Sequence, residues 1–378
     1  MLAQCAGEDL VVCNFMVANS DGDGVFDREY FRGRPDELST NETILYWNEE
    51  FRSTLWGHMT LLNLKQLVEP LFTGFRHTTH PHDHPTNADI GMATHDQDGH
   101  VNYTHPAHNV KDPYLSAYSA KELPIDLALG TVDSIDVMGT NHQAGMPLWY
   151  KFLNCGFHVP ASAGTDCFLN RIPSRLPGSD RVYVQVDGDF SYEHWIAGLK
   201  AGRTFVTNGP VLQFAVDGQQ PGATLRFDGP TTVKVAAQIR AEFPLKRIEL
   251  INNGAVAAST DIKEEGRDTR FETTFEREVS VGTSGWLALR VSGSPHPARP
   301  QFETFAHTSP VYLEIAGAPL DTRADAEYFL TWIDRLRELV RQRNRIPGRH
   351  AQHVETQIAT ARAVYQKLAG SVPATSKP

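Results

Sequence analysis

The stretch TILYWNEEFRSTLWGH, residues 43–58, joins a β-branched and aromatic run to two side chains that commonly bind metals. Its first five residues are typical of a strand, and the polar residues that follow indicate the end of that strand. We therefore expect Glu50 and His58 to lie just past a strand end. In α/β enzymes of the barrel type, chemistry takes place on the loops at such ends.

Two later segments predict the same placement for a histidine and an aspartate. A short alternating run ends at His105, and Pro106 stops the strand because proline has no backbone donor. Residues 157–163 form another strand-like run that leads into a glycine turn and then Asp166. The candidate metal ligands are Glu50, His58, His105 and Asp166.

These four side chains define the chemistry that we expect. Carboxylate and imidazole ligands without a thiolate suit zinc, manganese or iron, and open coordination positions are typical of a catalytic site. A bound metal lowers the pKa of water to roughly 7 and supplies hydroxide for hydrolysis. Taken singly, each side chain is better explained as the partner of a buried group. Together, at strand ends, they indicate a metal site.

Other side chains are candidates for a supporting role. His142 follows a strand-like run that ends near Met138 and is predicted to reach the same site, as a catalytic group or an extra ligand. His108 is predicted to orient a ligand or to act in catalysis, with a solvated loop histidine as the alternative. Arg203 and Asn208 are predicted to bind substrate, or else to fix a turn.

The chain is expected to divide into three parts. Residues 1–210 alternate strand-like and helical runs, which indicates an α/β domain. Residues 211–318 change to short alternating runs separated by glycine turns, which predicts a β-sandwich. Residues 319–378 carry helical periodicity interrupted at Pro347, which predicts a helical hairpin that ends at Gly370 and a disordered tail. We expect the hairpin to pack on its own chain.

Composition narrows the classes of protein and partner. The chain has 378 residues, 40% of them hydrophobic, a net charge of -10 and a pI near 5.9. That charge argues against nucleic acid as a partner. No apolar run is long enough to cross a membrane, and no export signal is visible, so the compartment stays open between cytoplasm and export through an upstream signal. The cysteines, which we expect to be reduced, are Cys5, Cys13, Cys155 and Cys167.

Two further motifs imitate metal sites. His77, His80, His82 and His84 form a dense tract, but the prolines within it favour a surface loop. The segment 19–27 resembles the start of a calcium loop, although it lacks the closing glutamate, so a polar turn is favoured.

Several motifs together resemble the polymerase-and-histidinol-phosphatase (PHP) superfamily of metal-dependent hydrolases, and within it the carbaryl-hydrolase-like CehA/McbA group. The resemblance covers about residues 1 to 315. The motifs lie at residues 49–58 (EEFRSTLWGH), 103–106 (YTHP), 153–156 (LNCG), 163–166 (AGTD), 201–210 (AGRTFVTNGP) and 306–310 (AHTSP).

The resemblance implies a distorted, incomplete β/α barrel in which Glu50, His58, His105 and Asp166 hold the metal and an ester or carbamate is hydrolysed. The sequence differs from the family pattern in two places. No His-x-His strand precedes Glu50, as would be expected of a chain truncated at its N-terminus, and Phe168 occupies a position where the superfamily commonly has a histidine. A phosphoesterase that uses the same site is one alternative. A degenerate barrel that binds a partner without catalysis is another. Substrate, metal identity, nuclearity and oligomeric state are left open.

Overall fold

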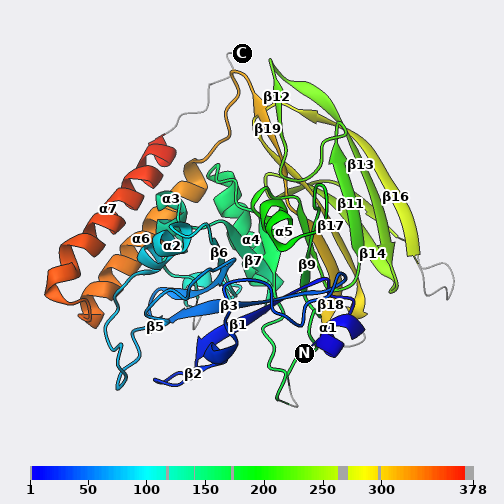
Figure 1. Cartoon of the computed structure of the whole chain (residues 1–378). Coiled ribbons are helices and arrows are strands. Elements are labelled where there is room, and N and C mark those ends of the chain that lie inside the picture. Colours follow the sequence, from blue (N-terminus) through cyan, green and yellow to red (C-terminus); the bar gives the residue numbers. More distant parts are fainter. Residues whose placement is uncertain are drawn as a thin grey trace.

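The computed structural model describes residues 2–115, 119–139, 141–171, 174–262, 271–296 and 299–370. Its first sheet has eight strands in the order β2-β1-β3-β4-β6-β7-β8, with β5 paired to β3 (Figure 1). β1 and β3 run parallel, as do β6, β7 and β8, whereas β4 is antiparallel to β3 and β6. The strands are β1 (Val12–Asn19), β2 (Val25–Phe26), β3 (Ile44–Ser53), β4 (Gly57–Leu62), β5 (Phe72–Thr73), β6 (His100–Tyr103), β7 (Ser134–Met138) and β8 (Ala161–Ala163).

This part of the molecule mixes helices and strands, in agreement with the predicted α/β class. It does not form a closed barrel among the described strands, because β2 and β8 end the order and no pairing joins them. The β8 edge instead meets the next sheet. Thr204 Oγ1 donates to the Ala161 carbonyl at 2.8 Å, and Ser309 Oγ accepts from the Ala161 amide at 2.9 Å.

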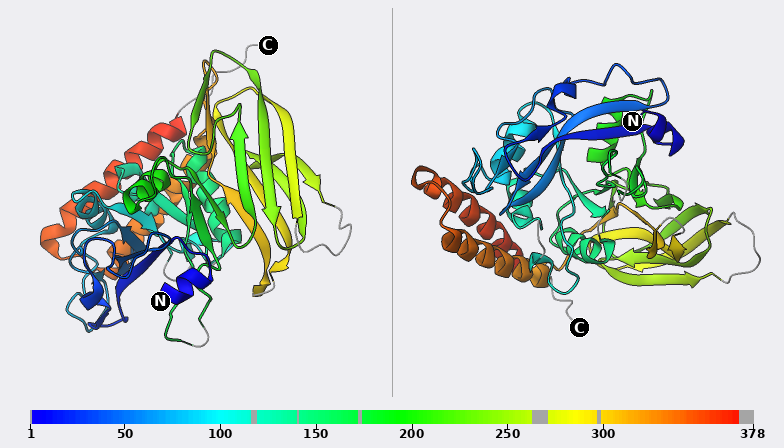
Figure 2. Two further views of the ribbon diagram at one scale, coloured as in Figure 1. Left: turned by 45° about the vertical axis from the view of Figure 1, so that its right-hand side comes forward. Right: turned by 90° about the horizontal axis from the view of Figure 1, so that it is seen from below.

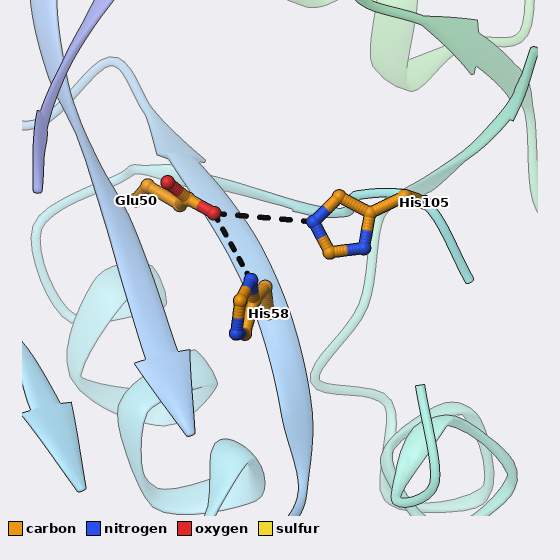
Figure 3. Close-up of side chains that lie close together, drawn as sticks. All are labelled: Glu50, His58 and His105. Atoms are coloured by element: carbon orange, nitrogen blue, oxygen red, sulfur yellow. Dashed lines mark ion pairs between the residues drawn. The ribbon is translucent and has the colours of Figure 1, made fainter. Parts of the chain in front are cut away.

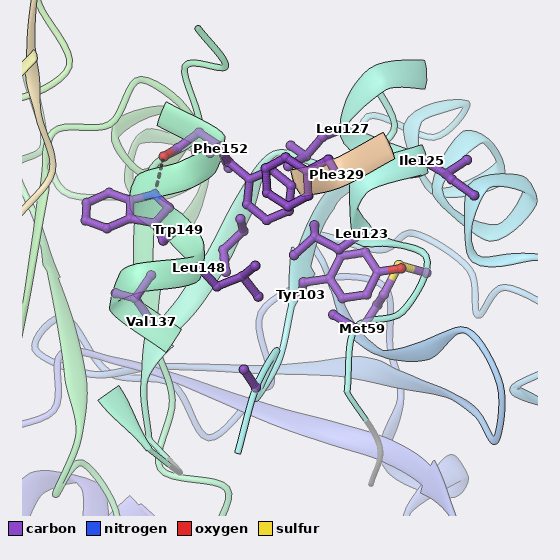
Figure 4. Packing of buried hydrophobic residues seen from close by; sticks show 14 of the residues in the cluster. Met59, Tyr103, Leu123, Ile125, Leu127, Val137, Leu148, Trp149, Phe152 and Phe329 are labelled. Atoms are coloured by element: carbon purple, nitrogen blue, oxygen red, sulfur yellow. Dashed lines mark hydrogen bonds between the residues drawn. The ribbon is translucent and has the colours of Figure 1, made fainter. Parts of the chain in front are cut away.

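One face of the first sheet is apolar and is covered by helices (Figure 4). Phe51, Met59 and Tyr103 from the strands pack with Trp149 and Phe152 in one buried cluster, which supplies most of the hydrophobic stabilisation of this region. The covering helices are α2 (Asn87–His95), α3 (Leu123–Leu129) and α4 (His142–Asn154).

The other face of the sheet is partly covered by α5 (Tyr192–Lys200). Tyr192 stacks on Tyr46 with ring centroids 4.2 Å apart, and its hydroxyl donates to Asn14 Oδ1 at 2.6 Å and accepts from Asn48 Nδ2 at 3.1 Å. Strand β3 is therefore buried on both faces over most of its length. Polar side chains on this face must find partners inside the protein.

The second part of the molecule contains two sheets that share an apolar core (Figure 2). The larger sheet has the order β12-β19-β17-β18-β10-β9, with β14 on β17 and β15 on β14, and the smaller has the order β11-β13-β16. The strands are β9 (Arg181–Val184), β10 (Thr204–Thr207), β11 (Val211–Val216), β12 (Thr224–Phe227), β13 (Thr231–Ala241), β14 (Leu245–Asn252), β15 (Ala255–Asp261), β16 (Phe271–Val281), β17 (Gly285–His296), β18 (Arg299–Thr308) and β19 (Val311–Ile315).

Strand pairing crosses the predicted boundary at residue 210. β10 pairs antiparallel with both β9 and β18, so two strands that precede residue 211 belong to the sheet of the predicted sandwich. The family-like segment 201–210 thus joins the two parts rather than ending the first.

The C-terminal helices α6 (Arg323–Arg343) and α7 (Gly348–Gly370) form the predicted hairpin, separated near Pro347. They pack on the first part of the molecule, where Tyr365 Oη donates to the Pro124 carbonyl at 2.9 Å and Trp332 Nε1 to the Lys121 carbonyl at 2.8 Å. The predicted tail, 371–378, lies outside the described residues.

The end of α6 also holds the turn between β3 and β4. Arg343 donates to both carboxylate oxygens of Asp83, each at 2.8 Å, and to Thr54 Oγ1 at 3.0 Å. Trp56 Nε1 donates to the Asp83 carbonyl at 3.1 Å. The C-terminal hairpin and the β3–β4 turn are therefore fastened to one buried aspartate.

The four cysteines are free thiols. Cys5, Cys13 and Cys155 are buried free thiols, as expected, and Cys167 is a half-buried one. Cys5 lies in α1 (Leu2–Gly7).

None of the helices in the described ranges combines the length and the apolar character needed to span a bilayer.

Candidate metal site

The register of the first sheet gathers polar side chains on one face. Arg52 lies opposite His58, and Glu50 opposite Thr60, in the antiparallel β3–β4 pair. Because opposite residues of a pair share a face, these four side chains point to the same side. The sequence-based placement of Glu50 and His58 beyond strand ends was wrong, since both lie inside strands.

The same polar face continues across β6, β7 and β8. Asn102 lies opposite Thr60 and beside Ser134 in the ladder. Asn102 donates to Thr60 Oγ1 at 2.9 Å and accepts from Ser134 Oγ at 2.8 Å, and Ser134 Oγ is also 2.8 Å from His100 Nε2. A continuous hydrogen-bonded band therefore flanks the cluster described next.

Glu50, His58 and His105 converge on one point (Figure 3). Glu50 Oε1 is 3.1 Å from His58 Nδ1 and 4.0 Å from His105 Nε2. One ligand atom from each residue lies within 4.8 Å of the other two, and within the described ranges no other His, Cys, Asp and Glu side chains meet this criterion. Three side chains from β3, β4 and the loop after β6 are thus arranged around a common centre.

The protonation states of Glu50 and His105 are those that a metal requires. Burial raises the pKa of Glu50, but the hydrogen bond and charge of His58, with the charges of Arg52 and His105, outweigh it and leave the pKa lowered. Burial, with repulsion from His58, lowers the pKa of His105 to about 3. At neutral pH Glu50 is ionised and His105 is neutral, so each offers a lone pair without first losing a proton.

Asp166 lies near the cluster but outside the three-residue group. It follows β8 by three residues and has a left-handed backbone with φ 51°, as His105 has with φ 34°. Asn, Asp and His adopt this backbone more readily than other residues with a side chain. Burial and the Glu50 charge raise the pKa of Asp166, while Arg175, His58 and Arg52 oppose that shift. Asp166 therefore interacts electrostatically with Glu50 and His58 of the cluster.

Two residues near this site were not foreseen as part of it. Asp136, on β7, is buried, and its pKa is raised to about 7 by burial and by Asp166, although Asn102, Ser162 and Thr104 donate hydrogen bonds that lower it. Arg175 Nη1 donates to the carbonyls of Gly139 at 2.8 Å and Thr165 at 3.0 Å. The sequence signal that could have identified Arg175 was its position in the loop that carries Asp166.

The two predicted catalytic histidines have different surroundings. His108 lies beside His105 with ring centroids 5.6 Å apart, and burial, then the charges of Arg175 and His58, lower its pKa. His142 instead contacts β18: its Nε2 is 3.2 Å from Glu303 Oε1, and its ring stacks on Phe305 at 4.3 Å. The structure thus brings His108, rather than His142, to the cluster.

Arg203 and Asn208 hold backbone segments in place. Arg203 Nε donates to the Gln185 carbonyl at 3.4 Å, and its Nη1 pairs with Asp187 at 3.1 Å. Asn208 donates to the Glu303 carbonyl at 2.9 Å and accepts from the Phe305 amide at 2.7 Å, which fixes the end of β10 to β18. These contacts correspond to the alternative that the sequence left open, in which both residues stabilise a turn.

The two motifs that imitate metal sites are occupied by protein contacts. In the calcium-like segment, Asp21 pairs with Arg52 at 2.6 Å, and Asp23 Oδ1 accepts from the amide and the hydroxyl of Thr79 at 2.7 and 2.6 Å. In the histidine tract, His84 stacks on His350 of α7 with centroids 3.6 Å apart. Both segments therefore serve as packing elements.

Comparisons with known proteins add no assignment. No family model matches the chain, and neither the curated proteins nor the solved structures contain a significant match. The geometry and chemistry of the site itself are therefore the basis for assigning a function.

Proposed function

We propose that this chain is a metal-dependent hydrolase in which Glu50, His58 and His105 hold a divalent metal and Asp166 approaches it from the loop after β8. The observation that carries the proposal is the convergence of three ligand atoms within 4.8 Å from three separate elements. We also propose, on the motifs quoted above, that the open first sheet is a distorted barrel of the PHP type, similar to the CehA/McbA group.

The residues fit a metal by their chemistry and by the atoms that they turn toward one another. Imidazole nitrogens and a carboxylate oxygen, without thiolate, suit zinc, manganese or iron. His105 turns its Nε2 toward Glu50 Oε1, at 4.0 Å, and His58 turns its Nδ1 toward the same oxygen, at 3.1 Å. When bound at such a site, the metal would lower the pKa of water to roughly 7 and polarise a substrate carbonyl.

The surrounding side chains favour an ester or carbamate. Val110 and Phe168, on the loops that follow His105 and Asp166, are 55% and 51% exposed. Apolar groups on ligand-bearing loops are suited to the uncharged part of an organic substrate. His108, beside His105, would position that ring, and the buried carboxyl of Asp136 would hold a proton close to the site.

Metal content and hydrolysis test the proposal together. We expect purified protein to retain about one equivalent of zinc, manganese or iron after dialysis, and to hydrolyse aryl esters or carbamates. His58→Ala should lose the metal and reduce the rate by about 100-fold or more. His194→Ala, at an exposed histidine of α5, should change neither. Equal, metal-independent rates in the wild type and His58→Ala would contradict the proposal.

A phosphoesterase is the second candidate, favoured by the two arginines near the cluster. Arg52 and Arg175 both act on Asp166 electrostatically, and arginine recognises phosphate oxygens well. Aryl phosphates belong in the same assay: faster turnover of phosphate than of ester would reverse the ranking. A stably folded protein that binds no metal would favour the third candidate, a binding protein without catalysis.

A further inference from the structure

Arg52 is a basic residue that lies beside the proposed metal ligand Glu50. It shares a sheet face with Glu50 and lies opposite His58 in the β3–β4 register. Its Nε is 3.9 Å from Glu50 Oε1, the same oxygen that faces both histidines. A fixed positive charge is thus present beside the atom on which the metal site is centred.

The guanidinium group is held from the side away from Glu50. Nη1 donates to the Asn19 carbonyl at 2.7 Å, and Nη2 pairs with Asp21 at 2.6 Å. Asn19 is the last residue of β1, and Asp21 lies in the turn between β1 and β2. The buried Nε has no hydrogen-bond partner among the described residues, since the Glu50 oxygen is beyond hydrogen-bonding range. Anchoring the β1–β2 turn explains the Nη contacts but not this unsatisfied Nε.

Charge balance suggests what Arg52 does. Glu50 and Asp166 contribute up to two negative charges and Asp21, which pairs with Arg52, contributes a third, whereas Arg52 and Arg175 supply two positive charges. One divalent ion would leave room for an anionic nucleophile, whereas a second would place a large excess of positive charge in a buried region.

Building on the proposed function, we propose that Arg52 is a built-in cation that takes the electrostatic place of a second metal and limits the site to one divalent ion. The inference assigns a role to a residue that binds neither metal nor substrate directly. It also predicts that metal affinity is held below the value the ligands alone would give, because Arg52 repels the ion.

Metal titration of the apoprotein tests this role without using activity. Zinc and manganese are titrated by calorimetry, and bound metal is counted by mass spectrometry after dialysis. Wild type should bind one equivalent. Arg52→Met, which keeps the aliphatic part of the side chain, should bind the first ion about tenfold more tightly or more, and should gain a second equivalent. Arg52→Lys should keep a single equivalent because it keeps the charge. Arg226→Met, at an exposed ion pair of β12, is the matched control and should resemble wild type.

The outcomes separate this inference from the proposed function. Two tightly bound equivalents in wild type, or unchanged affinity and stoichiometry in Arg52→Met, would overturn the role of Arg52 and leave the metallohydrolase proposal standing. If Arg52→Lys behaves like Arg52→Met, the anchoring contacts rather than the charge control the site, and the inference also fails. Absence of bound metal in all four proteins would overturn both. Circular dichroism shows whether each variant is folded, and a variant that loses the fold is replaced by Arg52→Gln.

Discussion

Strands β3 and β13 place polar side chains by different rules. In β13, buried Val233, Val235 and Ile239 alternate with exposed Lys234 and Gln238, because one face of the strand meets the second core and the other meets solvent. In β3, residues 44–49 are all buried. A polar residue in β13 therefore marks the surface, whereas one in the buried part of β3 marks a partner or a ligand.

The strongest test of this difference is at Phe51, the apolar neighbour of Glu50. Its side chain is fully buried in the helix-covered cluster, so Phe51→Ala should lower the free energy of unfolding by about 3–5 kcal/mol. Thr232→Ala, at an exposed position of β13, should change it by less than about 0.5 kcal/mol. Urea unfolding followed by circular dichroism compares the two. Similar costs would show that the helix-covered face is poorly packed.

Metal should stabilise the first region without acting on the second. At a free metal concentration of about 100 times Kd, the expected gain is about 2.7 kcal/mol, because the ion binds only the folded site. Ile239→Ala, in the core of the sandwich, should keep this increment in thermal unfolding, and His58→Ala should lose it. An equal increment in His58→Ala would place the metal elsewhere.

Two buried glutamates, one in each region, allow the effect of removing a single charge to be compared. Glu249 of the sandwich pairs with Arg290 at 2.7 Å and Arg247 at 3.1 Å, so Glu249→Gln should cost about 1–3 kcal/mol. Glu122, in the first region, accepts from the Asn87 amide at 2.7 Å, and burial together with Asp126 raises its pKa well above the ordinary value.

The raised pKa fixes the sign of the effect at Glu122. The folded protein keeps the proton, so stability is fully present below pH about 4.5 and decreases as pH rises toward the folded pKa. Glu122→Gln should therefore stabilise the protein by about 1 kcal/mol at pH 8 and little at pH 4. Unfolding measured at both values checks this. A loss of stability at pH 8 would mean that Glu122 is ionised and has a cationic partner.

At neutral pH the smallest expected effect is that of His100 in the hydrogen-bonded band, because its contribution to stability changes only below about pH 6.5. Burial is the main cause that lowers its pKa to about 4. Its contribution to stability is complete above pH 6.5 and is lost as pH falls from there to 4, by up to about 1.4 kcal/mol per pH unit. His100→Gln should flatten the pH dependence of unfolding in this window. The exposed His194→Ala should leave it unchanged, and equal slopes in all three proteins would contradict the assignment.

Local patterns in the sequence predicted part of this molecule. The hairpin was predicted because apolar residues such as Phe329, Ile333 and Leu336 recur with helical spacing and are buried in α6. The pairing of β9 and β10 with the second sheet was not predicted, because β10 and its partner β18 are about a hundred residues apart and such a pairing leaves no local pattern in the sequence.

The candidate site shows the same division. Glu50, His58 and His105 were identified by residue type, but Glu50 and His58 were misplaced beyond strand ends because polarity was taken as the end of a strand. Where both faces of a sheet are buried, that signal fails. Arg52 and Asp136 gain their surroundings only from the register across β3, β4, β6 and β7.

The contact between Arg343 and Asp83 joins two parts of the chain that are synthesised at very different times. Asp83 is synthesised 260 residues before its partner Arg343. The Asp83 carbonyl accepts from Trp56 and Arg343 donates to Thr54, so the pair fixes the turn between the strands that carry Glu50 and His58. The nascent chain therefore lacks this brace until its last helices leave the ribosome. A gene fragment that stops before residue 323 would yield the ligands without their support, and such a product should be sensitive to proteases at that turn.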